Sequence, residues 1–182
     1  MRPDRSRRRE FEQVAVKHLD EIYRYACRLT RQPPLAEDLT QETFLQAWSS
    51  FARFEPGTNC RAWLYRIFHH VHSHARRRSN RETARVEMAD LPDHALLYDP
   101  PLPRVFDRRL VQDAFGALPP DARELLLLAE VEGFTYREIA SILEIPIGTV
   151  MSRLNRARKR LRALVISKVN ESAPPRVSGE RG

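Results

Sequence analysis

One stretch decides the fold of this chain: residues 133–162, with the sequence GFTYREIASILEIPIGTVMSRLNRARKRLR. Thr135 can cap a helix, and Glu138 three residues later completes a capping box. Pro146 ends that helix, because a proline cannot continue it and restricts the residue before it. The stretch therefore predicts two short helices joined by a tight turn.

The second of these helices combines a buried stripe with a basic exposed face. Apolar residues recur every three to four positions, which predicts a buried stripe made of Ile147, Val150, Leu154, Ala157 and Leu161. No acid occurs between Ile147 and Arg162. This layout is typical of a helix-turn-helix whose second helix enters the major groove of DNA. The alternative is a solvated basic helix with no nucleic-acid role.

The exposed face of that helix carries groups that suit base edges and phosphates. Arginine can bridge the two major-groove acceptors of guanine, asparagine can pair with adenine, and serine can donate or accept. Cations later in the helix are better placed for phosphates, which position a protein without reading sequence. We therefore predict a duplex-DNA site made of Thr149, Ser152, Arg153, Asn155, Arg156, Lys159 and Arg160.

The composition of the whole chain favours a polyanionic partner, because 182 residues carry a net charge of +7. No apolar run is long enough for membrane insertion, and the arginine-rich N-terminus lacks the apolar segment of a secretory signal. Cys27 and Cys60 lack the close spacing of a metal-binding pair, so we expect free thiols in a cytoplasmic protein. Only six glycines and a 3.6-residue periodicity predict an all-α fold.

The periodicity predicts two small helical domains joined by a flexible linker, the second domain containing the helix-turn-helix. We expect a disordered basic lead-in at residues 1–9, a first domain at 10–78, a linker at 79–103, a second domain at 104–168 and a loose tail at 169–182. The linker is assigned where periodicity fades and prolines gather. Helices of the first domain are expected near residues 10–30, 35–51 and 60–78. The apolar face of the first would hold Phe11, Ala15, Leu19, Ile22, Ala26 and Leu29.

The helix predicted at residues 35–51 has an acidic side, formed by Glu37, Asp38, Gln41 and Glu42. These acids suit the N-terminal end of a helix, so a solvated face is one interpretation. A docking patch for a basic partner protein is the other, and composition alone favours the solvated face.

The loop at residues 54–59, FEPGTN, is marked by its Pro-Gly pair, and Thr58 or Asn59 could cap the next helix. One side of that helix interleaves aromatic and basic groups at helical spacing: Arg61, Tyr65, His69, His72 and Arg76. Such a side suits unpaired bases and backbone phosphate, because any base can stack on an aromatic face. Trp63 fits either that surface or the core.

His70 and His74 lie one helical turn apart and could both reach a metal ion. No carboxylate or cysteine nearby in the sequence completes such a site. We therefore expect no metal and no cofactor, and histidines that face DNA or solvent.

Three blocks in order resemble bacterial RNA polymerase sigma factors of the extracytoplasmic-function group. They are AEDLTQETFLQAW (36–48), RFEPGTNCRAWLYRI (53–67) and LPPDARELLLLAEVEGFTYREIASILEIPIGTVMSRLNRARKRL (118–161). The resemblance covers nearly all residues from Phe11 to Leu164. A helix-turn-helix alone would be a far less specific indication of this family than the three blocks together.

The resemblance implies a protein without catalytic activity that binds core RNA polymerase and directs promoter-specific initiation. The block around Asp38, Gln41 and Glu42 resembles the surface that docks on the clamp coiled coil of the polymerase. That likeness reverses the preference for a merely solvated face. The helix-turn-helix resembles the reader of the distal promoter element, with Ser152, Asn155 and Arg156 as base contacts.

The loop at residues 54–59 and the helix after it resemble the part that melts the proximal promoter element. In this family a base of the non-template strand is flipped into a pocket at that loop, at the cost of a few kcal/mol of stacking. The residues that we expect near that strand are Asn59, Arg61, Tyr65, Arg66, His69 and Arg76.

Met151 departs from the pattern, because many relatives place a lysine or arginine there, so a phosphate or base contact is missing. The form IPIGTVMSRL, residues 145–154, resembles a branch controlled by redox-responsive, zinc-binding anti-sigma proteins. This implies a stress response in which an anti-sigma factor covers the DNA-facing and polymerase-facing surfaces.

Two other classes of protein fit parts of the sequence. A stand-alone helix-turn-helix regulator would leave the acidic side of residues 35–51 and the PGTN loop without a role. A hydrolase or nuclease built on the histidines would need a metal ion and carboxylate partners that the sequence does not supply.

Overall fold

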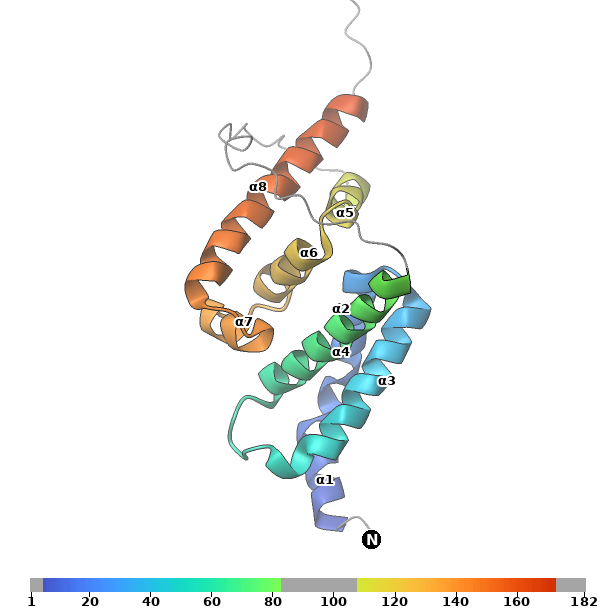
Figure 1. The fold of residues 1–182 in the computed structure, drawn as a ribbon, viewed down its shortest axis with the longest axis vertical. Coiled ribbons are helices and arrows are strands. Elements are labelled where there is room, and N and C mark those ends of the chain that lie inside the picture. Colours follow the sequence, from blue (N-terminus) through green and yellow to red (C-terminus); the bar gives the residue numbers. More distant parts are fainter. Residues whose placement is uncertain (1–4, 83–107, 173–182) are drawn as a thin grey trace, which may run out of the picture.

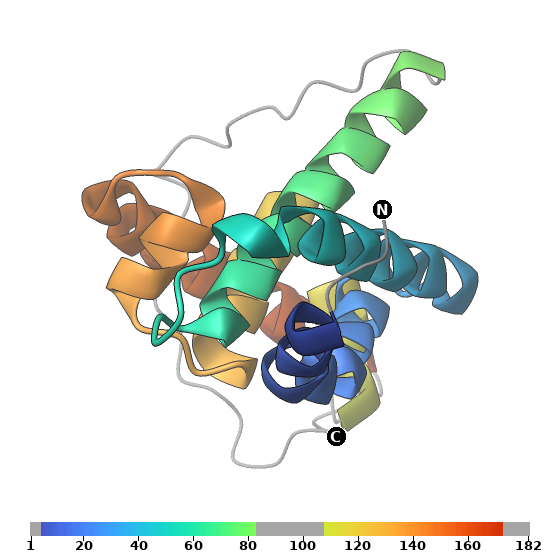
Figure 2. The ribbon, with the colours of Figure 1, turned by 90° about the horizontal axis from the view of Figure 1, so that it is seen from below.

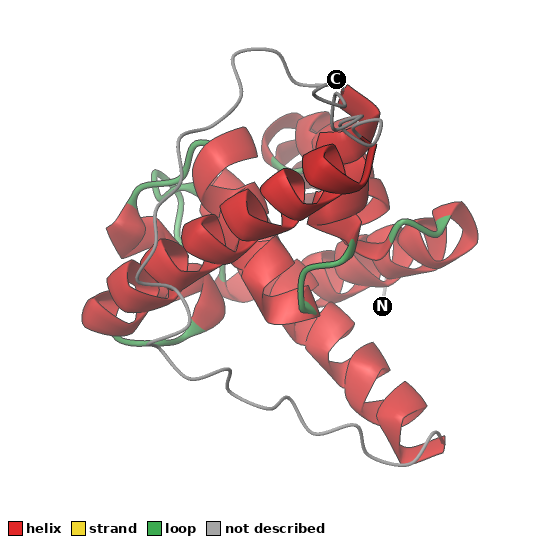
Figure 3. Cartoon of the chain, turned by 90° about the horizontal axis from the view of Figure 1, so that it is seen from above, coloured by secondary structure: helices red, strands yellow, loops and turns green. Residues whose placement is uncertain are grey.

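The computed structural model describes residues 5–82 and 108–172. All regular secondary structure within these residues is helical (Figure 3). This confirms the predicted all-α class. We call residues 5–82 the N-terminal unit and residues 108–172 the C-terminal unit. Most of the predicted linker lies outside the described residues. No helix within these two units is both long and apolar enough to cross a membrane.

The N-terminal unit is a bundle built around three long helices (Figure 1). Its elements are α1 Arg5–Val14, η1 Val16–His18, α2 Leu19–Thr30, α3 Pro33–Ser50, η2 Phe51–Arg53 and α4 Cys60–Glu82. Helix α3 packs against both α2 and α4. Tyr25 anchors the core between α2 and α4, because its ring meets those of Tyr65 and Phe68 edge-on at centroid distances of 4.8 and 5.2 Å.

The N-terminal end of this unit differs from the prediction in two ways. Helix α1 begins at Arg5, so the expected disorder of residues 1–9 is wrong for 5–9. Arg7 contributes to this order, because its guanidinium stacks on Trp48 and donates to the Trp48 carbonyl at 3.1 Å. A short 3-10 turn also interrupts the single helix expected at residues 10–30. The turn changes the register of the apolar face, and Leu19 is 42% exposed rather than buried.

The C-terminal unit places one long helix across three shorter ones. Its elements are α5 Arg108–Gly116, α6 Pro120–Leu126, the π-helical turn η4 Leu127–Val131, α7 Tyr136–Leu143 and α8 Ile147–Ser172. Helix α8 packs against α5, α6 and α7, with Leu128, Ile139 and Leu154 fully buried between them. It continues to Ser172, so the beginning of the predicted loose tail is helical, and residues 173–182 lie outside the described residues.

The helix-turn-helix forms as its local signals predict. The Thr135 hydroxyl accepts from the Glu138 amide at 3.3 Å, and the Glu138 carboxylate accepts from the Thr135 amide at 2.9 Å, which completes the capping box. Glu144 ends α7 in the left-handed region, at a φ of 55°. In α8 the predicted stripe is buried at Val150, Leu154 and Ala157, and Leu161 is half-buried. Ile147 is 43% exposed, so that prediction is wrong: as the first residue of α8, it lies beyond the packed stripe.

Candidate polymerase and nucleic-acid interfaces

Helix α3 turns its acidic side outward. Asp38, Gln41 and Glu42 are all exposed, whereas Leu39 and Thr43 on the opposite side are buried. Buried threonines fit this helix because their hydroxyls donate to backbone carbonyls one turn earlier, as Thr43 does to Leu39 at 2.6 Å. We call the surface of Asp38, Gln41 and Glu42 the α3 patch. It is a rigid, water-facing carboxylate surface that could meet a basic partner.

Sequence reasoning missed Leu45, which lies next to the α3 patch and is 64% exposed. An apolar side chain beside a charged surface is a common component of protein interfaces. Leu45 follows Gln41 by four residues on the same helix, so the two share one face. That spacing is the signal by which the residue could have been found.

The basic face of α8 is open to solvent in this structure. Ser152, Arg153, Asn155, Arg156 and Lys159 are exposed, and Thr149 and Arg160 are half-buried. Ser152 donates its hydroxyl to the Thr149 carbonyl at 3.1 Å. Across the described residues, the side chains of Arg153, Asn155, Arg156, Lys159 and Arg160 make no hydrogen bond or ion pair. These groups are therefore available to a duplex.

The corresponding face of α4 is covered, because it meets the C-terminal unit. Helix α7 packs on α4, while α6 and η4 pack on α2, and Figure 2 shows α7 beside the beginning of α4. The centre of this contact is Glu132, whose side chain is only 6% exposed. The Tyr65 hydroxyl donates to the Glu132 carboxylate at 2.7 Å, and Arg61 donates to the Glu132 carbonyl at 2.9 Å. Arg61 also donates to the Glu21 carboxylate in its own unit.

Further pairs extend this contact along α4. Asn59 donates to the Glu138 carboxylate at 2.8 Å, and a ring nitrogen of His69 lies 2.9 Å from a Glu124 oxygen. Arg76 pairs with Asp121 toward the end of the contact. We call the whole contact the inter-unit seam. On its N-terminal side lie Asn59, Arg61, Tyr65, His69 and Arg76, and on its C-terminal side Asp121, Glu124, Glu132 and Glu138.

The structure thus brings together five of the six residues that we expect near the proximal strand. The side chains of these five residues are bonded to acidic residues of the C-terminal unit. Arg66 is the exception, because it is half-buried and makes no side-chain hydrogen bond or ion pair within the two units. The role of all six in binding DNA stays a prediction. For a nucleic-acid strand to reach the covered face, the seam must open.

Apolar and carbonyl contacts reinforce the seam. Phe134 of the C-terminal unit packs edge-on against Tyr65 at a centroid distance of 4.8 Å. The Arg61 guanidinium lies 4.1 Å from the centre of the Phe134 ring. Arg123 donates to the Leu29 carbonyl of the N-terminal unit at 2.8 Å. The Glu132 side chain is only 6% exposed beside these contacts, and limited access of water strengthens the attraction of its charged partners.

Two histidines of α4 have pKa values that are shifted in opposite directions. Burial alone would lower the pKa of His69, but its hydrogen bond to Glu124 and the negative charge there raise that pKa above its ordinary value. Burial lowers the pKa of His72, and its Nδ1 atom has no hydrogen-bond partner among the described residues. Burial and the Glu132 carboxylate both raise the pKa of Tyr65, so its hydroxyl stays a donor.

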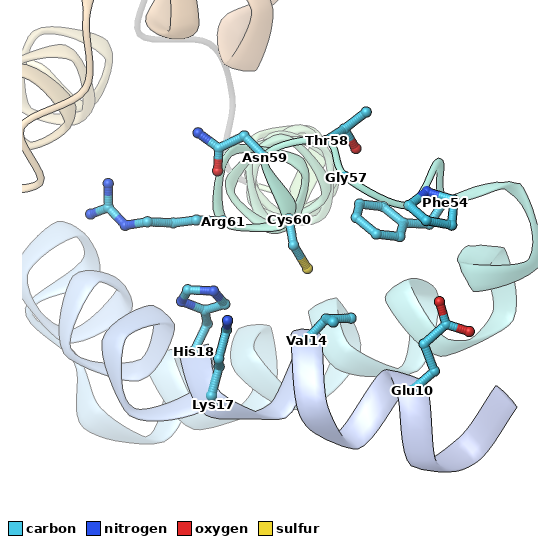
Figure 4. A pocket seen from close by; sticks show the side chains of 11 residues that line it. Glu10, Val14, Lys17, His18, Phe54, Gly57, Thr58, Asn59, Cys60 and Arg61 are labelled. Atoms are coloured by element: carbon cyan, nitrogen blue, oxygen red, sulfur yellow. The ribbon is translucent and has the colours of Figure 1, made fainter. Parts of the chain in front are cut away.

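A cavity of about 400 Å³ lies beside the loop that precedes α4. Figure 4 shows Cys60 pointing into it from the start of α4, with Lys17 and His18 on the facing wall from η1. Asn59 lines the same cavity and caps α4, because its side-chain oxygen accepts from the Ala62 amide at 3.1 Å. The prediction of a cap at Thr58 or Asn59 is therefore confirmed, with Asn59 in the role.

Trp63 and His70 are among the remaining residues that the sequence singles out. Trp63 is half-buried and packs on Phe54 at a centroid distance of 4.9 Å, so it belongs to the edge of the core. His70 lies 3.2 Å from a Glu144 oxygen across the seam. Within residues 5–82 and 108–172, no group of three or more histidines, cysteines or acids is arranged to hold a metal ion. Cys27 and Cys60 are free thiols.

Comparison with known proteins identifies two family models in the chain. The model described as Sigma-70 region 2 matches residues 14–82, and the model described as Sigma-70, region 4 matches residues 108–161. The ECF RNA polymerase sigma factor SigE of Mycolicibacterium smegmatis is 35% identical over 170 residues, which are 90% of this chain and 64% of that protein. The ECF RNA polymerase sigma factor EcfG of Rhodopseudomonas palustris is 36% identical, over 78% of this chain and 77% of that protein.

A solved structure shows the same likeness in three dimensions. The sigma factor RpoE of Bartonella quintana, crystallised with the anti-sigma factor NepR, matches with a TM-score of 0.68 and 31% identity. The match covers 86% of this chain and 97% of that one.

Proposed function

Because this chain belongs to the extracytoplasmic-function sigma factors of the sigma-70 family, we propose that it binds core RNA polymerase and directs promoter-specific initiation in the cytoplasm. It performs no covalent step of its own. The observation that carries the proposal is the placement of two exposed surfaces, the α3 patch and the α8 basic face, on separate units with both family regions present.

The α3 patch is the proposed docking surface for the polymerase. Three polar or charged side chains on one rigid helix can meet a basic or amide-rich helix pair, and Leu45 can add apolar contact beside them. The carboxylates contribute chiefly to association rate and to specificity, because charge complementarity steers the encounter of two proteins.

The α8 face is the proposed reader of the distal promoter element as duplex. Ser152, Asn155 and Arg156 suit base edges, and Lys159 and Arg160 suit phosphates. These side chains are exposed while the seam is closed, except for the half-buried Arg160. The distal element can therefore be engaged without any change in the arrangement of the two units.

The α4 face is the proposed binding surface for the melted proximal strand, and it must first separate from the C-terminal unit. Tyr65 is 1% exposed and its hydroxyl is bonded to Glu132, so no base can stack on it while the seam is closed. The cavity beside Asn59 and Cys60 lies at the loop that resembles the family's base-capturing loop. A volume of about 400 Å³ accommodates one nucleobase, which fits capture of a flipped base there.

An anti-sigma factor is the proposed regulator, in keeping with a stress response. The RpoE relative was solved with such a partner, NepR. A partner that holds the two units together would keep the α4 face covered, and one that also lies over α3 would block the polymerase. Its release would free α3 and would allow the seam to open.

Binding to purified core polymerase tests this proposal. Fluorescently labelled chain should bind core tightly, and Asp38→Arg or Glu42→Arg should weaken that binding at least tenfold by reversing the charge of the α3 patch. Asp113→Arg is the matched control, because Asp113 is an exposed acid on α5 of the other unit. Core binding that is absent, or equally weakened by all three changes, would contradict the proposal.

A further inference from the structure

The beginning of α8 exposes two large apolar side chains within an otherwise polar face. Ile147 is 43% exposed and Met151 is 54% exposed. They lie four residues apart, so they are neighbours on one line of the helix, and Asn155 continues that line one turn further on. Exposed apolar residues are ordinary when they are isolated. Here they are paired, and they adjoin a residue proposed to contact a base.

The surroundings of this pair favour nucleic acid as the occupant. Arg156 and Lys159 lie on the same exposed part of α8, and no acid occurs in the first sixteen residues of the helix, 147–162. This charge complements a phosphate backbone. In a helix-turn-helix, residues near the N-terminal end of the second helix are the ones that contact base edges. Met151 is the fifth residue of α8.

The chemistry of the pair selects one feature of the major groove. A thioether and a branched alkyl group cannot pair with a phosphate or form a bidentate hydrogen bond with a base. The apolar group that a base pair presents in the major groove is the C5-methyl of thymine. Methionine is long and flexible, so it can adapt its contact to that methyl group.

We propose that Met151, supported by Ile147, contacts the C5-methyl group of a thymine in the distal promoter element and thereby contributes to its sequence specificity. This inference rests on the proposed function, because it assumes that α8 binds the distal element as duplex.

Replacing thymine with deoxyuridine tests the inference, because that change removes the C5-methyl group alone. Duplexes are first selected from a randomised distal element by holoenzyme reconstituted from core polymerase and the full chain. Each thymine of the selected site is then replaced singly by deoxyuridine, and the affinity ratio is measured. We expect one position to weaken binding about three- to fivefold, the effect of losing one buried methyl group.

Variants of exposed residues identify the side chain responsible without threatening the fold. Met151→Ala should bring the thymine-to-deoxyuridine ratio at that position close to one, and Met151→Leu should retain it. Val131→Ala, an equally exposed apolar residue of the same unit at 51%, should leave it unchanged. Circular dichroism confirms that each variant is folded.

Three results would overturn the inference: a selected site without thymine, a ratio near one at every position, or a ratio that Met151→Ala leaves intact. These results differ from failure of the proposed function. In that case the holoenzyme would select no sequence, or no holoenzyme would form.

Discussion

Tyr65 of α4 donates its hydroxyl to Glu132 of the C-terminal unit at 2.7 Å, across a seam that leaves the Glu132 side chain only 6% exposed. Arg61 and Arg28 donate to the same carboxylate, at 3.3 and 3.2 Å. The carboxylate therefore satisfies aromatic and basic groups on the face of α4 that is proposed to bind a nucleic-acid strand. The closed arrangement and the proposed strand-bound arrangement compete for the same donors.

Removing the Glu132 carboxylate should open the seam. Glu132→Ala deletes hydrogen bonds to a charged group, which contribute about 1.5–3 kcal/mol each, so the closed arrangement should lose at least tenfold in population relative to the open one. The measurement is the distance distribution between spin labels on Leu45→Cys and Ala163→Cys, in a background with Cys27→Ser and Cys60→Ser.

Glu130→Ala is the matched control for that change. Glu130 lies two residues earlier and pairs with Arg158 of its own unit at 2.6 Å, away from the seam. Its removal should leave the distance distribution unchanged. Identical distributions for Glu132→Ala and the parent would show that Glu132 does not hold the units together.

The closed arrangement should weaken as pH rises. Glu124 raises the pKa of His69 above the ordinary 6.5, with Glu144 and Asp121 acting in the same direction, so protonated His69 stabilises the seam. This contribution is complete below the ordinary pKa and is lost as pH rises through the raised pKa. His72 has the opposite dependence, because burial lowers its pKa and disfavours its protonation.

His69→Gln isolates the first of these two effects. Spin-label distances measured between about pH 5.5 and 8.5, where histidine titrates, should show the parent opening toward high pH. The same series for His69→Gln should show no such opening. A parent series that is flat, or that opens only toward low pH, would contradict the assignment to His69.

Local signals in the sequence predict the helix-turn-helix well. Thr135 and Glu138 form their capping box, and Pro146 follows the end of α7, because each of these features depends on residues within one turn of the chain. The burial of Val150 and Leu154 follows from helical spacing alone. Ile147 has the same helical spacing but is exposed. It is the first residue of the helix, where spacing does not reveal whether a neighbouring element covers a side chain.

The seam could not be predicted from the sequence, because it joins residues that are far apart along the chain. Helical spacing places Arg61, Tyr65 and His69 on one side of α4 and indicates that this side binds something polar. Nothing local shows that Glu132 and Glu124 are their partners, more than fifty positions away in each case. The break before α2 was missed for a related reason, since the apolar spacing continues through it to Leu19.

Base and phosphate contacts on α8 should respond differently to substitution. Arg156→Ala should weaken binding to a distal-element duplex by about 1–3 kcal/mol and should relax specificity at one position, if Arg156 bridges a guanine. Lys159→Ala should weaken binding to all sequences alike and should reduce the salt dependence by about one unit of slope. Titrations at several salt concentrations, on the selected duplex and on a scrambled one, measure both effects.

The two variants serve as each other's control, because both remove an exposed cation from one helix. Equal losses on selected and scrambled duplexes for Arg156→Ala would make Arg156 a phosphate contact. Sequence-specific losses for Lys159→Ala would reverse the two assignments.

The capping box of α7 should contribute measurably to stability. Thr135→Ala removes the hydroxyl that accepts from the Glu138 amide, and loss of such a cap costs about 0.5–2 kcal/mol. Urea unfolding of the full chain measures this loss. Thr58→Ala is the control, since Thr58 is exposed in a loop and its hydroxyl donates to a carbonyl without capping a helix. Equal destabilisation by the two changes would exclude a special role for the capping box.

Run-off transcription tests the central claim most directly. Purified core polymerase is supplied with genomic promoter fragments, with and without the full chain, and with Glu42→Arg or Asp113→Arg in its place. The claim predicts discrete transcripts that require the chain, disappear with Glu42→Arg and persist with Asp113→Arg. Duplex DNA binding by the chain, without any transcript from any fragment or any association with core polymerase, would contradict it and would favour a stand-alone helix-turn-helix regulator.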